Sequence, residues 1–309
     1  MLVIDEINSV NIKESTYIAL GSFDGLHKGH LSLINKAKEL AQKSNGKSMV
    51  FSFRNHPLSL IKPDSAPKLL MSNEDKIKIL EELNIDIFTL VDFDEKFMKI
   101  EPEDFVALLC SKYNVSGIIV GFNYRFGYKN KGNTDLLKSL ENKYGYKLYV
   151  LDAYTYENKV VSSSRIRNEI SRGNVEKANN MLSRAYSLEG KVIHGKKLGR
   201  QLGFPTANMD FSQSYVLPKT GVYYTNALID NSLYKGITSV GHNPTVHGNH
   251  LTIETYILDF EQDIYDKSLR IFFLKRIRDE KKFNSLEELI EQLNSDKEFA
   301  VNEALSFNL

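Results

Sequence analysis

The apolar residues of this 309-residue chain change their spacing near residue 180. Before that point, short apolar runs such as TYIAL (16–20) and MVFSF (49–53) alternate with longer amphipathic segments, as in βαβ units with a mostly parallel sheet. After it, the spacing approaches two, and Gly, Asn and Asp separate short runs that are typical of a small β-barrel or sandwich. The sequence therefore predicts an α/β domain over residues 1–183 and an all-β domain over 184–309. A closing helix is expected within 284–305.

The composition excludes several classes of partner and site. Forty basic and 39 acidic residues give a formal net charge of +1, so no one-signed field attracts nucleic acid or a membrane, and anionic ligands must be bound locally. The one cysteine, Cys110, excludes an intrachain disulfide and a cysteine-based zinc site. Asp5 and Glu6 stand where a signal peptide would be basic and then apolar. We therefore expect a cytoplasmic protein with small-molecule substrates; its oligomeric state is left open.

The segment GSFDGLHKGH (21–30) lies where an apolar strand ends and a helix begins. Its glycines let the backbone approach a ligand, and the helix N-terminus offers unpaired N–H groups to a phosphate. His27 and His30 are three residues apart, so both could donate to one phosphate as negative charge develops. Two loop histidines are often merely exposed, but the whole string favours phosphate binding. It resembles the HxGH signature of the nucleotidyltransferase superfamily, whose members transfer AMP from ATP.

Two further segments of this half carry groups that could bind a nucleotide or a flat ring. SSSRIR (162–167) offers hydroxyls and two arginines ahead of a helix; the competing interpretation is a serine N-cap with solvated arginines. It resembles the second, basic signature of the same superfamily, with Ser164 in place of threonine. The loop GFNYRFG (121–127) follows the apolar run SGIIV. Its rings could stack on a ligand at the carboxyl end of a strand, or they could only pack the loop onto the core.

The all-β half carries a second group of polar residues. No P-loop pattern G-x-x-x-x-G-K-[ST] occurs, so a nucleotide would need another phosphate cradle, for which HGKKLGR (194–200) supplies glycines and cations. Thr206 and Asn208 alternate by two and share one face of an extended segment, where their neutral oxygens suit Mg²⁺ that ATP also ligates. Glu254 could accept a proton from an attacking hydroxyl; an exposed strand glutamate is the plainer interpretation.

Together these segments resemble the bacterial bifunctional riboflavin kinase/FAD synthetase family, from GSFDGLHKGH through GFPTAN to RIRDEKKF. The resemblance implies an α/β nucleotidyltransferase domain, Rossmann-like and carrying HxGH, followed by a small all-β barrel domain with a C-terminal helix. It implies phosphorylation of riboflavin to FMN by ATP, with Mg²⁺, and adenylyl transfer from a second ATP to FMN, giving FAD and pyrophosphate.

The resemblance also assigns roles to residues. It implies four catalytic residues: His27, His30, Arg165 and Glu254. Residues implied to bind ATP are Gly21, Phe23, Asp24, Gly25, Ser163, Ser164, Arg167, Gly195, Lys197 and Gly199. Those implied to bind flavin are His56, Pro57, Asn123, Tyr124, Arg125 and Arg278, and those implied to hold the metal are Thr206 and Asn208. This chain departs from the family pattern at Ser22, where asparagine is common, at Asp266, where glycine is usual, and at GHNP (241–244).

Two rival functions follow from parts of the sequence. Another HxGH adenylyltransferase, with the barrel as a nonenzymatic module, would leave PTAN (205–208) and Glu254 without a role. A flavin-binding regulator without catalysis would have no use for the string HKGH (27–30).

Overall fold

The computed structural model describes residues 1–7, 10–195, 199, 202–245 and 248–305, and the chain divides into two compact units, Met1–Ser162 and Ser163–Leu309. The first is built on a parallel sheet and the second on a closed barrel, as the sequence predicts. The helices between 163 and 182 belong to the second unit because the later one packs on strands of the barrel. The boundary at 183/184 between two catalytic domains stays a prediction.

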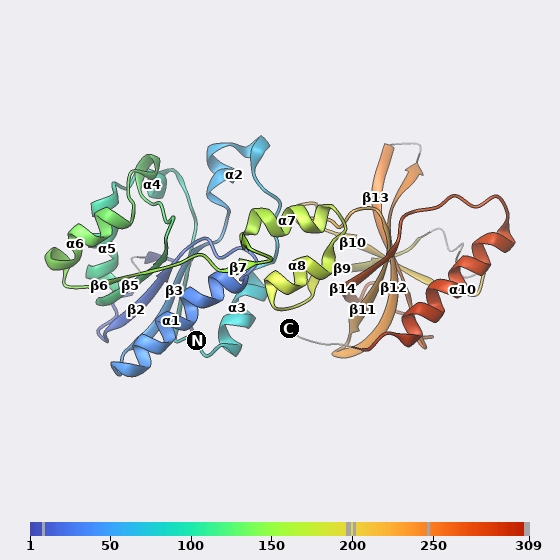
Figure 1. Cartoon of the computed structure of the whole chain (residues 1–309), viewed down its shortest axis with the longest axis horizontal. Helices are drawn as coiled ribbons and strands as arrows, with labels where there is room; N and C mark the ends of the chain where they lie inside the picture. The colour runs from blue at the N-terminus through green and yellow to red at the C-terminus, as the bar shows by residue number, and fades with distance from the viewer. Residues whose placement is uncertain (8–9, 196–198, 200–201, 246–247, 306–309) are drawn as a thin grey trace. The chain divides into compact units, whose positions relative to one another are not determined.

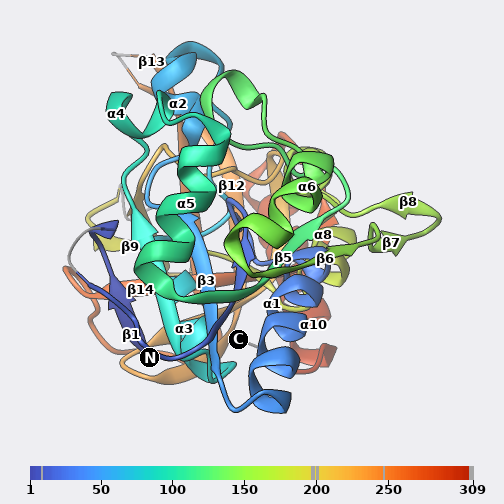
Figure 2. The same cartoon turned by 90° about the vertical axis from the view of Figure 1, so that its left-hand side faces the viewer.

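A six-stranded parallel sheet forms the centre of the first unit, in the order β1-β4-β3-β2-β5-β6 (Figure 1). Its strands are β1 (Leu2–Ile4), β2 (Thr16–Leu20), β3 (Lys47–Phe53), β4 (Ile87–Val91), β5 (Val115–Gly121) and β6 (Lys147–Leu151). The helices of this unit are α1 (Lys28–Lys43), α2 (Pro57–Ile61), η2 (Pro63–Ser65), α3 (Asn73–Glu82), α4 (Glu95–Met98), α5 (Pro102–Tyr113), η3 (Tyr128–Asn130) and α6 (Thr134–Tyr144). A hairpin of β7 (Thr155–Tyr156) and β8 (Lys159–Val160) projects beyond the sheet in Figure 2.

Apolar side chains cover both faces of this sheet, as expected for near-continuous apolar strands. On one face Leu20 and Phe51 pack against α5 and α6; on the other Val50 and Phe88 pack against α1 and α3. Burying each such side chain stabilises the fold by about 1.5–3 kcal/mol. From β2 the chain crosses to β3 on one side, and it later returns to β5 on the other side. The carboxyl ends of β2 and β5 therefore flank a switch point, where open α/β sheets bind ligands.

One local prediction was wrong. NHPLSLIKPDSAPK (55–68) is expected to be a long loop, but the structure forms α2 and η2 there. His56 caps α2 by accepting the Leu58 N–H on its Nδ1 at 3.1 Å, and Pro57 occupies the first helical turn. Proline at that position costs no hydrogen bond and presets the helical φ, which explains why so short a helix forms.

The second unit is a closed antiparallel barrel, so the barrel alternative is confirmed over the sandwich. Its strands, in barrel order, are β10 (Thr206–Phe211), β13 (Gly248–Ile257), β12 (Ser232–Thr245), β11 (Gly221–Ile229), β14 (Ser268–Arg278) and β9 (Tyr186–Ile193). Helices α7 (Ser163–Ser171) and α8 (Val175–Leu182) precede it, and α10 (Leu286–Asn302), capped by Ser285, follows it. Inside, the hydroxyls of Thr225, Thr238 and Thr255 form a chain of hydrogen bonds of 2.8 and 2.9 Å across β11, β12 and β13.

We predict that Gly127→Ala destabilises the first unit more than Gly145→Ala does. Both glycines have left-handed φ values, +69° and +75°, so each alanine carries a backbone cost of about 1–2 kcal/mol. At Gly127 a β-carbon would also lie 2.7 Å from Pro102, whereas at Gly145 nothing lies within 4 Å. Urea unfolding of the two variants checks this; equal losses of unfolding free energy would show that the contact with Pro102 is easily relieved.

Candidate active sites

The loop between β2 and α1 is held in an unusual backbone conformation. Phe23, Gly25 and Leu26 have φ values of +48°, +83° and +38°. Left-handed backbone at a non-glycine residue costs of order 1–3 kcal/mol and persists only where the surroundings enforce it. Here the side chains of Phe23 and Leu26 are fully buried in the core between the sheet and α1. Their burial offsets the strain and fixes the backbone of the loop that leads into α1.

Asp24 is buried beneath the same loop. Its carboxylate accepts the N–H of Leu70 at 3.1 and 3.3 Å. The side chain of Lys76 on α3 is also buried, which lowers its pKa to about 8, and the charge of Asp24 opposes that shift. Since the side chains of Phe23 and Asp24 face the protein, a contact of these two residues with ATP would use their backbone groups.

The two histidines lie together at the start of α1. His27 is the N-cap, and its Nδ1 accepts the N–H of His30 at 3.2 Å, so the proton of the neutral ring is on Nε2. The two rings stack with centroids 3.6 Å apart, and Phe23 packs edge-on to His30 at 5.2 Å. The neutral ring of each histidine carries one N–H that it can donate. The pair can therefore offer hydrogen bonds to a phosphate at the start of α1.

A cavity of about 550 Å³ opens at the carboxyl ends of β2, β3, β4 and β5. It brings together several residues that the sequence analysis assigned to ATP or flavin: Gly21, His30, Pro57, Asn123, Tyr124 and Arg125. Tyr124 stacks on Phe126 at 5.5 Å, and burial raises the pKa of its hydroxyl. Phe122, by contrast, is exposed and does not line the cavity. Tyr124 and Phe126 line the cavity and also pack against the core, so stacking of these rings on a ligand stays a prediction.

The sequence analysis missed most of the apolar wall of this cavity. The wall consists of aromatic rings that also pack edge-to-face on one another: Phe51, Phe53, Phe93, Phe97 and Phe105. They lie at the ends of β3 and β4 and on α4 and α5, far apart in the sequence. Only the strand-end position of Phe53 and Phe93 could have indicated them. A pocket with an aromatic wall and a few polar groups suits a flat heteroaromatic ligand.

The other residues predicted for the first site do not line this cavity. His56 caps α2, and Gly25 lies in the left-handed turn before His27. Ser163, Ser164, Arg165 and Arg167 lie in the first turns of α7, in the second compact unit. Their joint contact with phosphates bound at His27 and His30 stays a prediction.

In the barrel, strand pairing brings three predicted residues to one place. Asn208 on β10 lies directly opposite Glu254 on β13, and Thr206, two residues earlier, is on the same face. The Thr206 hydroxyl lies 3.5 Å from the Glu254 carboxylate. A hydroxyl, a carboxamide and a carboxylate are oxygen donors of the kind that Mg²⁺ prefers. Glu254 thus lies beside Thr206 and Asn208, and its role as a base stays a prediction.

The glycines ahead of β10 fit closely around these residues. A β-carbon on Gly195 would overlap the side-chain amide of Asn208, and one on Gly199 would overlap the carbonyl of Phe204. Lys197 lies outside the described residues. A second cavity of about 360 Å³ lies beside Thr206 and is lined by Phe260 and Tyr265. The ring of His194 packs on Tyr265 at 3.9 Å. The cavity could therefore hold a nucleotide next to a metal ion bound at Thr206 and Asn208 on β10.

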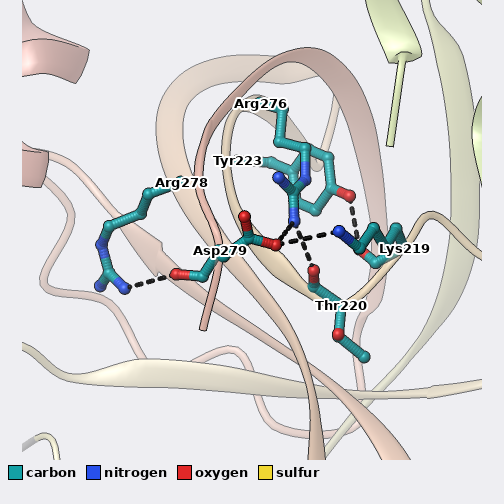
Figure 3. Close-up of polar contacts among 6 residues, drawn as sticks. All are labelled: Lys219, Thr220, Tyr223, Arg276, Arg278 and Asp279. Carbon is teal, nitrogen blue, oxygen red and sulfur yellow. Dashed lines mark hydrogen bonds and ion pairs between the residues drawn. The ribbon is translucent and has the colours of Figure 1, made fainter. Parts of the chain in front are cut away.

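Arg278, expected to contact flavin, ends β14 within a network of charges. Figure 3 shows Arg276 and Lys219 converging on the carboxylate of Asp279, at 2.8 and 3.1 Å. These two cations, Arg276 above all, lower the pKa of Asp279 to about 2. Arg278 donates to the backbone carbonyl of Asp279 at 3.2 Å and pairs with Asp296 on α10. The end of β14 is thus fixed by charge-assisted hydrogen bonds on both sides.

An α/β unit with paired histidines at a helix N-terminus, followed by a barrel with a Thr/Asn/Glu cluster, defines a two-site enzyme class that transfers groups from nucleotides. The comparisons with known proteins agree in both halves. A family model described as FAD synthetase matches residues 9–165, and one described as riboflavin kinase matches residues 182–303. The chain belongs to the bifunctional riboflavin kinase/FMN adenylyltransferase family.

Relatives match along nearly the whole chain. The bifunctional riboflavin kinase/FMN adenylyltransferase of Bacillus subtilis is 37% identical over 92% of this chain and 91% of its own length. That of Escherichia coli K12 is 32% identical over 92% and 91%.

A solved structure named as a macrolide-efflux protein from Streptococcus pneumoniae has a TM-score of 0.90, is 30% identical and covers 98% of this chain and 99% of its own. Among the described residues, no helix has both the length and the apolar character needed to cross a membrane.

We predict that Gly195→Ala lowers riboflavin phosphorylation by displacing Asn208. A shift of about 1 Å in a positioned group costs on the order of 100-fold in rate. FAD formation from supplied FMN is the internal control and should not change. If the effect operates through Asn208, the double variant Gly195→Ala/Asn208→Ala should be no slower than Asn208→Ala alone. Additive losses would contradict this explanation.

Proposed function

We propose that this chain makes flavin cofactors in two steps at two separate sites, phosphorylating riboflavin to FMN at the barrel and adenylylating FMN to FAD at the α/β unit. The observation that carries the proposal is the coexistence of two site geometries in one chain: stacked His27 and His30 at a helix N-terminus beside an aromatic cavity, and Thr206, Asn208 and Glu254 on adjacent strands. Catalytic domains spanning residues 1–183 and 184–309 are part of this proposal.

In the kinase step, the terminal ribityl hydroxyl of riboflavin attacks the γ-phosphorus of ATP. Glu254 takes the proton of that hydroxyl, the new P–O bond forms as the bond to ADP breaks, and FMN and ADP leave. The rate would depend mainly on positioning and on neutralising charge, because little covalent chemistry falls to the protein. The position of Glu254 on a fixed strand, opposite Asn208, supports its role as base.

Thr206 and Asn208 fit the role of holding Mg²⁺ in this step. Their neutral oxygens lie next to the carboxylate of Glu254, and Gly195 leaves no side chain between the backbone and the Asn208 amide. Two protein ligands are enough for Mg²⁺, because the ion keeps waters and substrate phosphates in its coordination sphere. When bound, the ion would neutralise charge on the ATP phosphates.

In the adenylyl step, a phosphate oxygen of FMN attacks the α-phosphorus of ATP in line, and pyrophosphate leaves. The Nε2–H of His27 and the ring of His30 donate to the phosphate oxygens as negative charge develops. The positive end of the α1 helix dipole adds to this site. The aromatic cavity beside His30 supports flavin as the acceptor, with Asn123, Tyr124 and Arg125 at its polar edge. Arg165 and Arg167 would also bind the phosphates of ATP.

Other predictions about the protein's surroundings stay predictions. The cytoplasmic location and the absence of nucleic-acid and membrane partners rest on composition, charge and the single cysteine.

We predict opposite losses of the two activities in two single variants. His30→Ala should reduce FAD formation from FMN by about 10²- to 10³-fold, because one donor to the developing charge is removed. Glu254→Gln should reduce FMN formation from riboflavin by about 10²- to 10⁴-fold, because the general base is removed while its shape is kept. Chromatography of the flavins after incubation with ATP and magnesium measures both steps, with FMN supplied separately for the second.

Each variant serves as the folding control of the other. His30→Ala should still phosphorylate riboflavin, and Glu254→Gln should still adenylylate FMN. Loss of both activities in either folded variant would show that the two sites are not independent.

A further inference from the structure

Helix α10 buries a carboxylate where an apolar side chain would be expected. Among its described residues only Asp296 and Ala300 are buried, and Asp296 is 2% exposed. An ionised carboxylate is costly to take out of water unless a partner satisfies it. Asp296 therefore marks a specific interaction rather than general packing of the helix.

Arg278 at the end of β14 is that partner. Its Nε lies 3.0 and 3.1 Å from the two Asp296 oxygens and its Nη2 lies 2.8 Å from one of them, a forked arrangement. Gln292, one turn earlier on α10, donates to the same carboxylate at 3.0 Å. A fork of this kind fixes the orientation of the guanidinium plane as well as its position.

The orientation leaves part of the guanidinium available. Arg278 has five N–H groups. Within the described part of the chain, its contacts with Asp296 and with the Asp279 carbonyl engage three of them. Its side chain is 20% exposed, and the ring of Phe283 lies 6.0 Å from its centre. Within the same residues, two N–H groups, one on each terminal nitrogen, thus remain for a ligand.

We infer that Asp296 is a positioning residue for riboflavin in the kinase step, acting through Arg278. The inference rests on the proposed function and on the contact with flavin that the family resemblance implies for Arg278. Asp296 does not touch the substrate; it sets the direction in which the two remaining N–H groups of Arg278 point. Val222, which pairs with Arg278 across β11 and β14, packs with Ala300 of α10 in one apolar cluster. The guanidinium therefore lies between the barrel wall and the helix.

The same helix offers a matched control for a merely structural role. Lys275, also on β14, pairs with Glu303 at the end of α10 at 3.0 Å. If the Arg278–Asp296 pair only fastened α10 to β14, breaking it would lower stability more than breaking the more exposed Lys275–Glu303 pair, but neither change would alter the KM for riboflavin selectively. If Asp296 orients a flavin-binding group, only its own replacement should change the response to riboflavin.

The test compares Asp296→Asn and Glu303→Gln in the full chain. For each variant the KM for riboflavin, the KM for ATP and kcat of phosphorylation are measured, together with thermal unfolding and FAD formation from supplied FMN. We expect Asp296→Asn to lower kcat/KM for riboflavin by about 10- to 100-fold, mainly through KM, because a lost hydrogen bond from a charged group weakens binding by about that factor. The KM for ATP and FAD formation should stay within about twofold of the unmodified chain, and Glu303→Gln should leave all these constants unchanged.

A second variant covers the case in which Asp296→Asn fails to fold. Arg278→Gln/Asp296→Asn replaces the charged pair by two amides, so no buried charge is left without a partner. It should fold and should show the same raised KM for riboflavin, with the KM for ATP unchanged. Normal riboflavin kinetics in this double variant, or equal effects of Asp296→Asn and Glu303→Gln, would overturn the inference. Absence of riboflavin phosphorylation by the unmodified chain would instead remove the proposed function on which it rests.

Discussion

Both candidate sites depend on the hydrogen-bonded register of β-strands. In the parallel sheet, register brings the carboxyl ends of β2, β3, β4 and β5 to one edge, where the loops carrying His30 and Asn123 meet. In the barrel, register sets Asn208 opposite Glu254 and places Thr206 on the same face. A slip of one residue would turn either strand's polar set to the opposite face. Apolar residues on the other face of β10 and β13, such as Met209 and Ile253, are buried and oppose such a slip.

The sequence allows much of the fold to be predicted, because apolar runs bounded by turn residues mark strands directly. β2 begins and ends at the predicted residues, and the predicted run 49–53 lies within β3. The misses have local causes. α2 depends on a histidine cap and a proline in only five residues, and α6 was not predicted although Asn133 caps it and Gly145 ends it. The departure from the family pattern at Asp266 also has a structural counterpart. Its φ is +65°, in the region that favours glycine, and its N–H bonds the Val192 carbonyl at 2.9 Å.

The sites are predictable only in part, because motifs reveal residues that are close in sequence. HKGH and PTAN each place two groups by helical or strand spacing, and the structure keeps both spacings. The aromatic wall of the first cavity comes from four separate elements and has no common motif. Asp296 is still harder to find, since its role arises from a partner 18 positions earlier on another element. The sequence does not show which carboxylates are buried. The cost of burying Asp296, which points to its partner, can therefore be recognised only in the structure.

Because the chain carries so little net charge, it can bind anionic substrates only through groups close to them. A formal charge of +1 gives no long-range attraction for ATP, so recognition must depend on the direction of donors at short range. The end of β14, which the resemblance assigns to flavin, shows how the direction of donors can be fixed. Arg276 and Arg278 are each paired with an aspartate, and Asp279 also binds Lys219. Such pairs add little net charge, yet they fix where the remaining N–H groups point, because a forked guanidinium cannot rotate without breaking two bonds. His27 and His30 follow the same rule in the other unit, since a stacked pair whose tautomer is set by a helix cap provides oriented donors rather than a large positive charge. If the proposed function is right, both units bind their substrates mainly through preorganised donors. The affinity for substrate should then depend on salt far less than in a protein that attracts its ligand through a broad positive surface.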